Sequence, residues 1–337
     1  MSQTRLVVRH APNSYTEAMT PLDNLSQNFS PVERARRFDA EHARKLRALA
    51  YRMLGSRAEA EDIVQEAWLR WAEVDESAVV NVGAYLSRVV THLCLDRFRS
   101  ISVQREQYIG VWLPEPFLDD ATAVDDTPGP EQQAEFAQDV SIAFMLALER
   151  LSPLERAGFL LHDVFDLGYD EIARHLDRNE ATCRQLISRA RKRVKEDYAR
   201  REVTEEERQR LFEAFADAVR SRDVGALAQV LADDVVLLAD GGGKVTAVPE
   251  PLHGREQVAS VFIGFARLPG SSGWRLQAAR VNGLPGCLIF NDHDGGRLVQ
   301  TIALAPSSTE MGRIGAVYVQ RNPDKLGYVT TGHGSPS

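Results

Sequence analysis

Apolar residues recur with a helical period between Phe38 and Arg99. The segment AEAEDIVQEAWLRW carries apolar side chains at relative positions 0, 3, 4 and 7, which form one face of a helix: Val64, Ala67, Trp68 and Trp71. The next segment, AYLSRVVTHLCLDRFRS, has the same spacing at Leu86, Val89, Val90 and Leu93. We therefore expect a helical bundle over this part of the chain.

The helical period stops in the segment VWLPEPFLDDATAVDDTPGPEQ, which holds four prolines, a glycine and an acidic bias. Such a composition cannot bury a core, and we interpret it as an extended linker. Helices resume at about Glu135 and continue to about Ala199. The sequence thus predicts a second helical module beyond the linker.

The period changes again after a helix that begins near Thr204. Thr204 and Glu207 form a Ser/Thr-x-x-Glu capping-box pattern, and the apolar face that follows holds Leu211, Phe212, Phe215 and Val219. The later segments DDVVLLA, GCLIFND, GRLVQTIALA and IGAVYVQ are typical of strands, and REQVASVFIGF is typical of a helix. The chain is therefore predicted to fold as two all-α modules followed by an α+β module.

The composition is that of a globular protein, with 44% hydrophobic and 26% charged residues among 337. No apolar run reaches the roughly 18 residues that a membrane-spanning helix needs, and the N-terminus lacks the apolar core of a secretory signal. Cys94, Cys183 and Cys287 lie far apart without a Cys-x-x-Cys pair. We expect a cytoplasmic protein with no membrane partner, disulfide framework or structural zinc site.

Positive charge is concentrated in one segment of an acidic chain. The net charge of −8 argues against non-specific nucleic-acid binding by the whole molecule. Between Arg178 and Arg201, however, basic residues outnumber acids: Arg184, Arg189, Arg191, Lys192, Arg193, Lys195 and Arg200. This pattern indicates DNA contact that is focused on one helix.

The basic residues fall in the second half of a predicted helix-turn-helix, LGYDEIARHLDRNEATCRQLISRARKRV. The first helix turns Ile172, Ala173 and Leu176 inward, and a polar turn follows at Asp177-Arg178-Asn179. The second helix buries Cys183, Leu186, Ile187, Ala190 and Val194. Its outward positions can reach base edges and phosphates in a major groove: Arg184, Gln185, Ser188, Arg189, Arg191 and Lys192. The alternative is an ordinary pair of helices with a solvated basic face.

These motifs, in this order, resemble a known family. AEDIVQEAWLRW, YLSRVVTHLCLDRFRS and the helix-turn-helix are similar to domains 2 and 4 of bacterial extracytoplasmic-function (ECF) sigma factors. WLPEP (112–116), DGGGK (240–244) and NPDKL (322–326) resemble the SigJ-like group of that family, which carries a fused SnoaL-like C-terminal domain. The resemblance implies sigma domain 2 at 37–102, a linker at 103–134, sigma domain 4 at 135–200 and a SnoaL-like α+β cone at 204–327. Residues 1–36 fall outside it; their polar, proline-interrupted start indicates a loosely ordered tail without an assigned role, and 328–337 form a C-terminal tail.

The resemblance implies an alternative sigma factor and no enzyme. Its partners would be the β and β′ subunits of core RNA polymerase and promoter DNA. In the family the helix matching AEDIVQEAWLRW docks on the β′ subunit, which assigns core binding to Asp62, Gln65 and Glu66; the alternative is a solvated acidic face. Arg88, His92, Arg97 and Arg99 would follow the DNA backbone at the −10 element, and the second helix of the helix-turn-helix would read the −35 element. Nearby, Asp96 is interpreted as a salt-bridge partner and Phe98 as a core residue.

The DGGGK segment looks at first like a phosphate-binding loop. It lacks the Gly-x-x-x-x-Gly-Lys-Ser/Thr spacing and is followed by VTAVPEP, which is not helical. A hairpin turn between VVLLA and VTAV is the better interpretation. The third glycine, between Asp240 and Lys244, suits a close approach by another part of the chain.

We therefore expect the C-terminal domain to pack on the sigma domains and to stand in for a separate anti-sigma factor. The regulatory contacts are assigned to three segments: Trp112, Leu113 and Pro114; Asp240, Gly241, Gly242, Gly243 and Lys244; Asn322, Pro323, Asp324, Lys325 and Leu326.

Two other functions remain open at this point. The chain could be a SnoaL-type cyclase or isomerase fused to DNA-binding helices, which would need an Asp-His pair in its cavity, with His253 and His293 as candidates. NDHD (291–294) has the side chains of a hard-metal site, but the Gly-Gly after it favours a turn. We assign no catalytic residue, metal or cofactor. A one-component, ligand-sensing regulator is the other alternative. Whether the C-terminal cavity holds a small ligand is open, and a fused regulator favours a monomer when the protein is free of polymerase.

Overall fold

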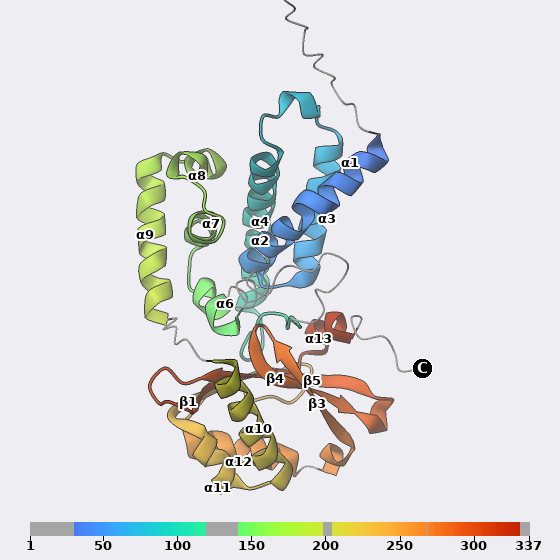
Figure 1. Cartoon of the computed structure of the whole chain (residues 1–337), viewed down its shortest axis with the longest axis vertical. Coiled ribbons are helices and arrows are strands. Elements are labelled where there is room, and N and C mark those ends of the chain that lie inside the picture. The colour runs from blue at the N-terminus through green and yellow to red at the C-terminus, as the bar shows by residue number, and fades with distance from the viewer. Residues whose placement is uncertain (1–29, 119–140, 198–203, 268, 331–337) are drawn as a thin grey trace, which may run out of the picture.

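The computed structural model describes residues 30–118, 141–197, 204–267 and 269–330, which form a helical body stacked on a sheet-containing body (Figure 1). The predicted architecture of two helical modules followed by an α+β module is confirmed. Most of the predicted N-terminal tail, the linker from residue 119 and the last seven residues lie outside the described part of the chain.

The first helical module comprises α1 (Pro31–Phe38), the π-helical turn η1 (Asp39–Ala43), α2 (Arg44–Leu54), α3 (Arg57–Ala72), the 3-10 turn η2 (Glu76–Ala78) and α4 (Val82–Glu106). Ser30 begins α1 in a capping box with Glu33, and the Ser56 side chain caps α3. Gly55 ends α2 with φ 73°, a left-handed conformation that lets α3 start two residues later.

The second helical module comprises α6 (Ile142–Glu149), α7 (Pro153–Phe159), the π-helical turn η4 (Leu160–Val164), α8 (Tyr169–Leu176) and α9 (Glu180–Asp197). Ser152 begins α7 in a second capping box, with Glu155. Asp177 ends α8 with φ 51°, and the short turn after it leads into α9. The predicted helix-turn-helix is therefore present.

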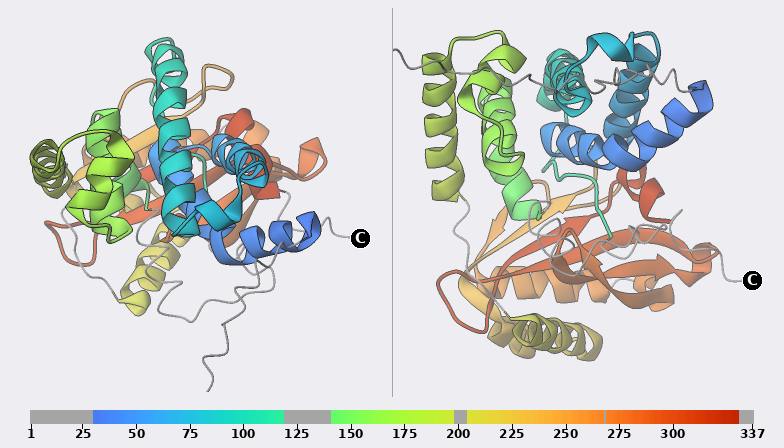
Figure 2. Two further views of the ribbon diagram at one scale, coloured as in Figure 1. Left: turned by 90° about the horizontal axis from the view of Figure 1, so that it is seen from above. Right: turned by 45° about the horizontal axis from the view of Figure 1, so that its top comes forward.

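The two helical modules share a single hydrophobic core. Its buried residues include Val64, Ala67 and Trp71 of α3, Leu86 and Leu93 of α4, and Leu160, Ile172 and Ile187 of the second module. Both predicted apolar faces in the first module point into this core. In the view from above, α4 lies beside the second module (Figure 2). The two modules are thus closed on each other.

The C-terminal body is a six-stranded sheet in the order β2-β1-β6-β5-β4-β3. The strands are β1 (Leu231–Asp240), β2 (Leu252–His253), β3 (Trp274–Val281), β4 (Leu284–Asn291), β5 (Arg297–Pro306) and β6 (Ile314–Gln320). Strands β1 and β6 pair in parallel, and the other neighbours are antiparallel.

Helices cover both faces of this sheet. Three helices, α10 (Glu205–Ser221), α11 (Val224–Val230) and α12 (Arg255–Ala266), lie on the face away from the helical body (Figure 1). Helix α13 (Pro323–Thr330) lies on the opposite face, next to the helical body. Because side chains alternate along each strand, the strands supply one core under α10–α12 and a second core toward the helical body.

Two details of the sheet differ from prediction. The turn at Gly242 and Gly243 is present, with φ of 62° and 69°, but VTAV is not a strand. Ala247 and Val248 pack on the core under α12 instead, and the strand that pairs with β1 begins only at Leu252. Strand β3 was not predicted. It lies at the sheet edge and leaves Leu276 38% exposed, so its alternation is weak in the sequence.

The interpretation of the WLPEP segment as chain that cannot bury a core is wrong. Leu113 and Leu118 are 1% and 3% exposed and belong to the core between the sheet and the helical body. The prolines hold this segment extended, and an extended segment can bury alternate side chains against a neighbouring surface.

Candidate nucleic-acid interface

Helix α9 presents one buried and one exposed face. Its inward residues Cys183, Leu186, Ile187, Ala190 and Val194 are at most 8% exposed. The six residues predicted to face DNA are all exposed: Arg184, Gln185, Ser188, Arg189, Arg191 and Lys192. The Asn179 side chain accepts a hydrogen bond from the backbone N–H of Thr182 at 2.8 Å, which fixes the start of the helix.

Acidic side chains hold several of the α9 arginines in place. Glu155, whose side chain is 5% exposed, accepts hydrogen bonds from Arg189 at 3.0 Å and from Arg193 at 2.8 Å. Burial raises the pKa of Glu155, but hydrogen bonds from Arg189 and Ser152 and the charge of Arg193 more than offset it, so the pKa lies below its ordinary value. The guanidinium groups therefore stand in fixed positions along the helix.

A second acid, Asp163 of η4, acts in the same way on the arginine between these two. Asp163 accepts from Nε of Arg191 at 2.7 and 3.1 Å, and this hydrogen bond raises the pKa of Arg191. Arg184 lies 4.1 Å from the centre of the Tyr169 ring and 3.3 Å from a Glu180 oxygen. The arginines of α9 are thus ordered before any DNA is bound.

Two of the predicted −10 residues on α4 face the second helical module. Arg88 donates to Asp177 at 2.8 Å, in the turn of the helix-turn-helix. Nε2 of His92 lies 2.5 Å from the His175 carbonyl oxygen and 3.6 Å from Asp177. Two of the four predicted −10 side chains therefore contact the module that is predicted to read the −35 element.

The other two candidates on α4 are paired within the first module. Arg97 forms a bidentate ion pair with Glu59 of α3, and the hydrogen bonds of this pair raise the pKa of Arg97. Arg99 is largely exposed and lies 3.5 Å from Asp96, the predicted salt-bridge partner. Phe98 is 8% exposed, in the core as predicted.

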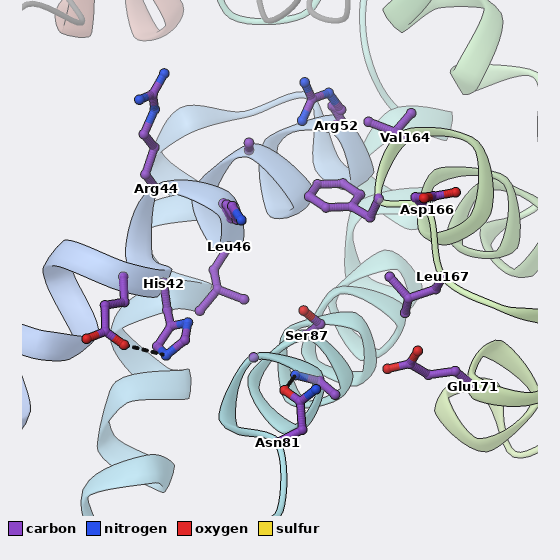
Figure 3. A pocket seen from close by; sticks show the side chains of 16 residues that line it. His42, Arg44, Leu46, Arg52, Asn81, Ser87, Val164, Asp166, Leu167 and Glu171 are labelled. Carbon is purple, nitrogen blue, oxygen red and sulfur yellow. Dashed lines mark hydrogen bonds and ion pairs between the residues drawn. The ribbon is translucent and has the colours of Figure 1, made fainter. Parts of the chain in front are cut away.

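A cleft of about 790 Å³ separates the two modules where they do not touch (Figure 3). His42, Arg44 and Arg52 line it from η1 and α2, and Asn81 and Ser87 line it from the start of α4. Val164, Asp166, Leu167 and Glu171 line it from the second module. The contact between modules is thus partial, with both apolar and polar side chains around the gap.

The predicted core-binding residues lie on an exposed face of α3. Asp62, Gln65 and Glu66 are exposed, and Glu66 accepts from Arg70 at 2.6 Å. Leu69, one turn further on, is 58% exposed. Sequence reasoning did not single out Leu69, although its spacing of 3, 4 and 7 from these three residues places it on the same face.

Asp240 links the linker to the sheet. Its carboxylate is fully buried and accepts from the Tyr108 hydroxyl at 2.5 Å, the Leu113 N–H at 2.9 Å and Lys325 Nζ at 2.7 Å. Gln320 donates to it at 3.2 Å. Burial and the hydrogen bond to Asp240 raise the pKa of Tyr108, which keeps its hydroxyl protonated and able to donate.

Lys325 and Asn322 complete this contact from α13 and the residue before it. Nζ of Lys325 also donates to the Leu113 carbonyl at 2.6 Å and lies 4.4 Å from the centre of the Trp112 ring. Asn322 donates to Tyr108 at 2.9 Å. The structure thus brings together residues from all three predicted regulatory segments.

The glycines allow this close approach. A Cβ atom on Gly242 would lie 2.3 Å from the Asn322 side chain, and Gly242 has a positive φ besides. Lys244 does not join the buried group; it forms an exposed ion pair with Asp324 at 2.5 Å. Of the two charged residues that flank the glycines, only Asp240 reaches the linker.

The linker is also held by the first helical module. The Glu115 carboxylate accepts from the Ser56 hydroxyl at 2.7 Å and from the Arg57 N–H at 2.6 Å, at the start of α3. Tyr51 donates to the Glu115 carbonyl at 2.9 Å and accepts from Asn282 of the sheet domain at 3.1 Å. Sequence reasoning missed these residues because single polar side chains far apart in sequence carry no periodic signal.

The sheet contacts both ends of the linker. The core on the inner face of the sheet holds Leu113 and Leu118 from the linker and Ile142 from the start of α6, together with Leu288, Tyr318 and Leu326 of the sheet domain. The exit from the first module and the entry to the second therefore rest on one surface.

The two histidines considered for catalysis lie outside the cavity of the sheet domain. His253 and His293 are exposed, and neither lines the apolar cavity under α12. The NDHD segment forms the turn η6 (Asp292–Asp294) between β4 and β5, as predicted. Over the described residues, no cluster of three His, Cys, Asp or Glu side chains could hold a metal ion. No helix in that part of the chain is long and apolar enough to span a membrane.

The comparisons with known proteins agree with this arrangement. The family model Sigma-70 region 2 matches residues 38–103, and Sigma-70 region 4 matches residues 141–194. The ECF RNA polymerase sigma factor SigJ of Mycobacterium tuberculosis is 37% identical over 298 residues, which cover 83% of this chain and 89% of SigJ. This chain is an ECF sigma factor.

Other relatives extend the likeness to the whole fold. The probable ECF RNA polymerase sigma factor SigI of Mycobacterium tuberculosis is 31% identical over 287 residues, which cover 85% of this chain and 92% of SigI. The crystal structure of SigJ superposes with a TM-score of 0.67 and 32% identity, over 89% of this chain and 99% of that one. The SnoaL-like C-terminal domain of this ECF sigma factor is therefore shared with SigJ. As members of the family do, the protein binds core RNA polymerase and promoter DNA and directs transcription initiation.

Proposed function

We propose that this sigma factor is held in a closed state by its own C-terminal domain, in place of a separate anti-sigma factor. The observation that carries the proposal is the buried Asp240, which holds the linker backbone at Leu113 while the same sheet packs on Ile142 of α6. The C-terminal domain thus restrains both helical modules at the points where the linker leaves and enters them.

The closed state is incompatible with the DNA contacts assigned to α4. Arg88 and His92 would follow the −10 backbone, yet in the closed state they contact Asp177 and the His175 carbonyl. Binding to both promoter elements then requires the two modules to separate. Arg97 and Arg99, the other assigned −10 residues, pair within their own module and do not oppose that separation.

Helix α9 is proposed to read the −35 element through its exposed face. Gln185 and Ser188 lie between arginines that Glu155, Asp163 and Glu180 order. An ordered row of guanidinium groups suits phosphate contacts, and an amide suits bidentate contact with adenine.

A single substitution tests the assignment of α9. Gln185→Ala should reduce discrimination between the cognate −35 sequence and a mutated one by about 1–3 kcal/mol. Gln209→Ala, on the exposed face of α10, is the matched control. The measurement is abortive initiation by the reconstituted holoenzyme on the two promoters. Equal discrimination by wild type and Gln185→Ala would remove this residue from the readout.

Core polymerase is proposed to bind α3 through Asp62, Gln65, Glu66 and the exposed Leu69, with β′ as the subunit in contact and β as a further contact for the second module. An acidic face around an apolar side chain suits a basic partner surface with an apolar pocket. We further propose that the free protein is a monomer, because the closed modules bury their apolar faces within one chain.

The closure itself is tested by transcription. Asp240→Ala should free the linker and raise promoter-specific initiation at limiting core polymerase. Asp324→Ala, which breaks only the exposed pair with Lys244, is the control and should leave initiation unchanged. The idea is wrong if Asp240→Ala, shown to be folded by circular dichroism, initiates no more often than wild type.

A further inference from the structure

The C-terminal domain contains an apolar cavity on the sheet face opposite to the linker. It lies between the sheet and helices α10 and α12 and is lined by Phe215, Phe262, Trp274, Ile302 and other apolar side chains. Polar side chains enter this lining at only two positions, Gln300 and Arg321. None of the interactions described above between the sigma domains and the linker uses this cavity.

Arg321 has no carboxylate partner among the residues that the structure describes. Its guanidinium donates to the Thr246 carbonyl and lies 5.7 Å from the centre of the Phe265 ring. Its Nε is buried without a hydrogen-bond partner, and among the described residues no carboxylate lies within ion-pair distance of it. Burial lowers the pKa of Arg321. A partly buried guanidinium whose Nε lacks an acceptor is stabilised when an anion supplies one.

The size of the cavity limits what it can take. The cavity volume is about 80 Å³. That volume corresponds to roughly six water positions, so a slender molecule of about six to ten heavy atoms fits without repacking. Leu276, at 38% exposure, and the half-buried Phe265 lie where the lining meets the surface.

We propose that this cavity binds a small apolar carboxylate, such as a medium-chain fatty acid or an aromatic acid. The carboxylate lies at Arg321 and accepts from its Nε, and the hydrocarbon part lies among Phe215, Phe262 and Trp274. Apolar walls with one unpaired cation favour such an anion over a neutral or cationic molecule of the same size.

The cavity is one residue away from the linker contact. The backbone N–H of Arg321 donates to the Asp240 carbonyl at 2.8 Å, and Gln320 and Asn322 on either side of it bind Asp240 and Tyr108. Side chains alternate along β1, so Ala239 lines the cavity while Asp240 faces the linker. The next step rests on the proposed function: a ligand that binds Arg321 changes the hydrogen bonds by which Asp240 holds the linker.

Binding is tested on the full-length chain without polymerase, by isothermal titration calorimetry with octanoate, octylamine and octanol. Octanoate should bind most tightly and octylamine not at all. Arg321→Met should weaken octanoate binding by about tenfold or more and leave octanol binding nearly unchanged. Arg297→Met, an exposed arginine on the same domain, is the matched control.

A second variant guards against loss of fold. Ala266→Leu fills the cavity from the end of α12 and leaves Arg321 unsubstituted, and it should abolish binding of both octanoate and octanol. The proposal is overturned if octylamine binds as well as octanoate, or if octanoate binds equally to wild type, Arg321→Met and Ala266→Leu.

The link to regulation is tested separately. Octanoate added to in-vitro transcription should change initiation by wild type and leave Asp240→Ala unaffected, because that variant has lost the contact on which the ligand acts. Binding without any effect on transcription would support the site and contradict its coupling to the linker. Absence of binding would contradict the site and leave the Asp240→Ala test of closure as it stands.

Discussion

Asp240 is a fully buried carboxylate whose charge is balanced by one lysine, Lys325, at 2.7 Å. A buried ion pair costs desolvation of both ions, so it adds little net stability over an apolar pair. The pair contributes to specificity, because removing either charge leaves the other one buried without a partner. The linker backbone completes the group, since both the N–H and the carbonyl of Leu113 bind to it. Docking of the linker therefore has a single well-defined geometry.

Removing the lysine should be costly. Lys325→Met leaves Asp240 buried without its cation and should lower the free energy of unfolding by about 3–5 kcal/mol. Lys244→Met breaks an ion pair whose side chains are 54% and 61% exposed, and should cost less than about 1 kcal/mol. Urea denaturation of both variants measures the difference. Equal midpoints for the two variants would show that the buried pair has no special role.

Glu155 makes the stability of the helix-turn-helix depend on pH. Its pKa is lowered in the folded state, so its stabilising effect is complete above the unfolded value of about 4.5 and is lost as the pH falls through the lowered folded value. Glu155→Gln should cost about 1–3 kcal/mol at neutral pH and should flatten the loss of stability below pH 4.5.

The control for that experiment is Glu180→Gln, because Glu180 is half-exposed in its pair with Arg184. Thermal melts between about pH 3 and pH 7 follow both variants, a range that includes the ordinary carboxyl pKa values of about 4. A Glu155→Gln profile parallel to wild type at all pH values would contradict the assignment of this carboxylate.

At the residue scale, the sequence predicts which side chains are exposed. It does not predict which distant residues they contact. The helical spacing of Cys183, Ile187 and Ala190 fixes which face of α9 is buried, and hence that Arg184 and Lys192 are exposed. No local pattern connects Asp240 with Tyr108 and Lys325, which are 132 and 85 residues away in sequence. Such pairings arise only when the tertiary fold brings distant elements together.

At the scale of single elements, α3 combines two roles. Its buried face joins the shared helical core, and its opposite face carries Asp62, Gln65, Glu66 and Leu69 toward solvent. A leucine that is 58% exposed beside acidic residues offers an apolar contact that a partner surface could bury.

Leu69→Ala should weaken binding to core polymerase by about 1.5–3 kcal/mol, the value of burying a leucine side chain. The fold should be nearly unaffected, since the side chain is 58% exposed and Leu69 is not a member of the core cluster of the first module. Val80→Ala removes an apolar side chain that is fully exposed and serves as the control. Fluorescence anisotropy with core enzyme gives both affinities. Unchanged affinity for Leu69→Ala would exclude this face of α3 from the interface.

Strong periodicity decided which elements could be predicted. Helices α3, α4, α9 and α12 and strands β1, β4, β5 and β6 have long apolar patterns and were predicted from them. Strand β3 is an edge strand with Arg275 and Gln277 outward, and β2 has two residues, so neither carries a clear pattern. The burial of the linker was not predicted, because proline content indicates the backbone conformation of a segment. It does not indicate whether the segment packs on a neighbouring surface.

At the scale of the whole molecule, three modules share two contact surfaces. The sigma domains share one hydrophobic core, and the C-terminal sheet packs on the linker and on α6. The candidate −10 residues Arg88 and His92 lie inside the first contact. In the proposed mechanism, opening would expose apolar surface between the modules and free these side chains, and the linker contact at Asp240 would control it.

The most direct test is the distance between the sigma domains in solution. Spin labels at Ala72→Cys on α3 and Ala181→Cys on α9 occupy exposed positions, while the native cysteines are buried. Double electron–electron resonance should give one short, narrow distance distribution for the wild-type background and for Asp324→Ala. Asp240→Ala should shift most of the population to longer, broader distances. An unchanged distribution in Asp240→Ala would contradict closure by the C-terminal domain.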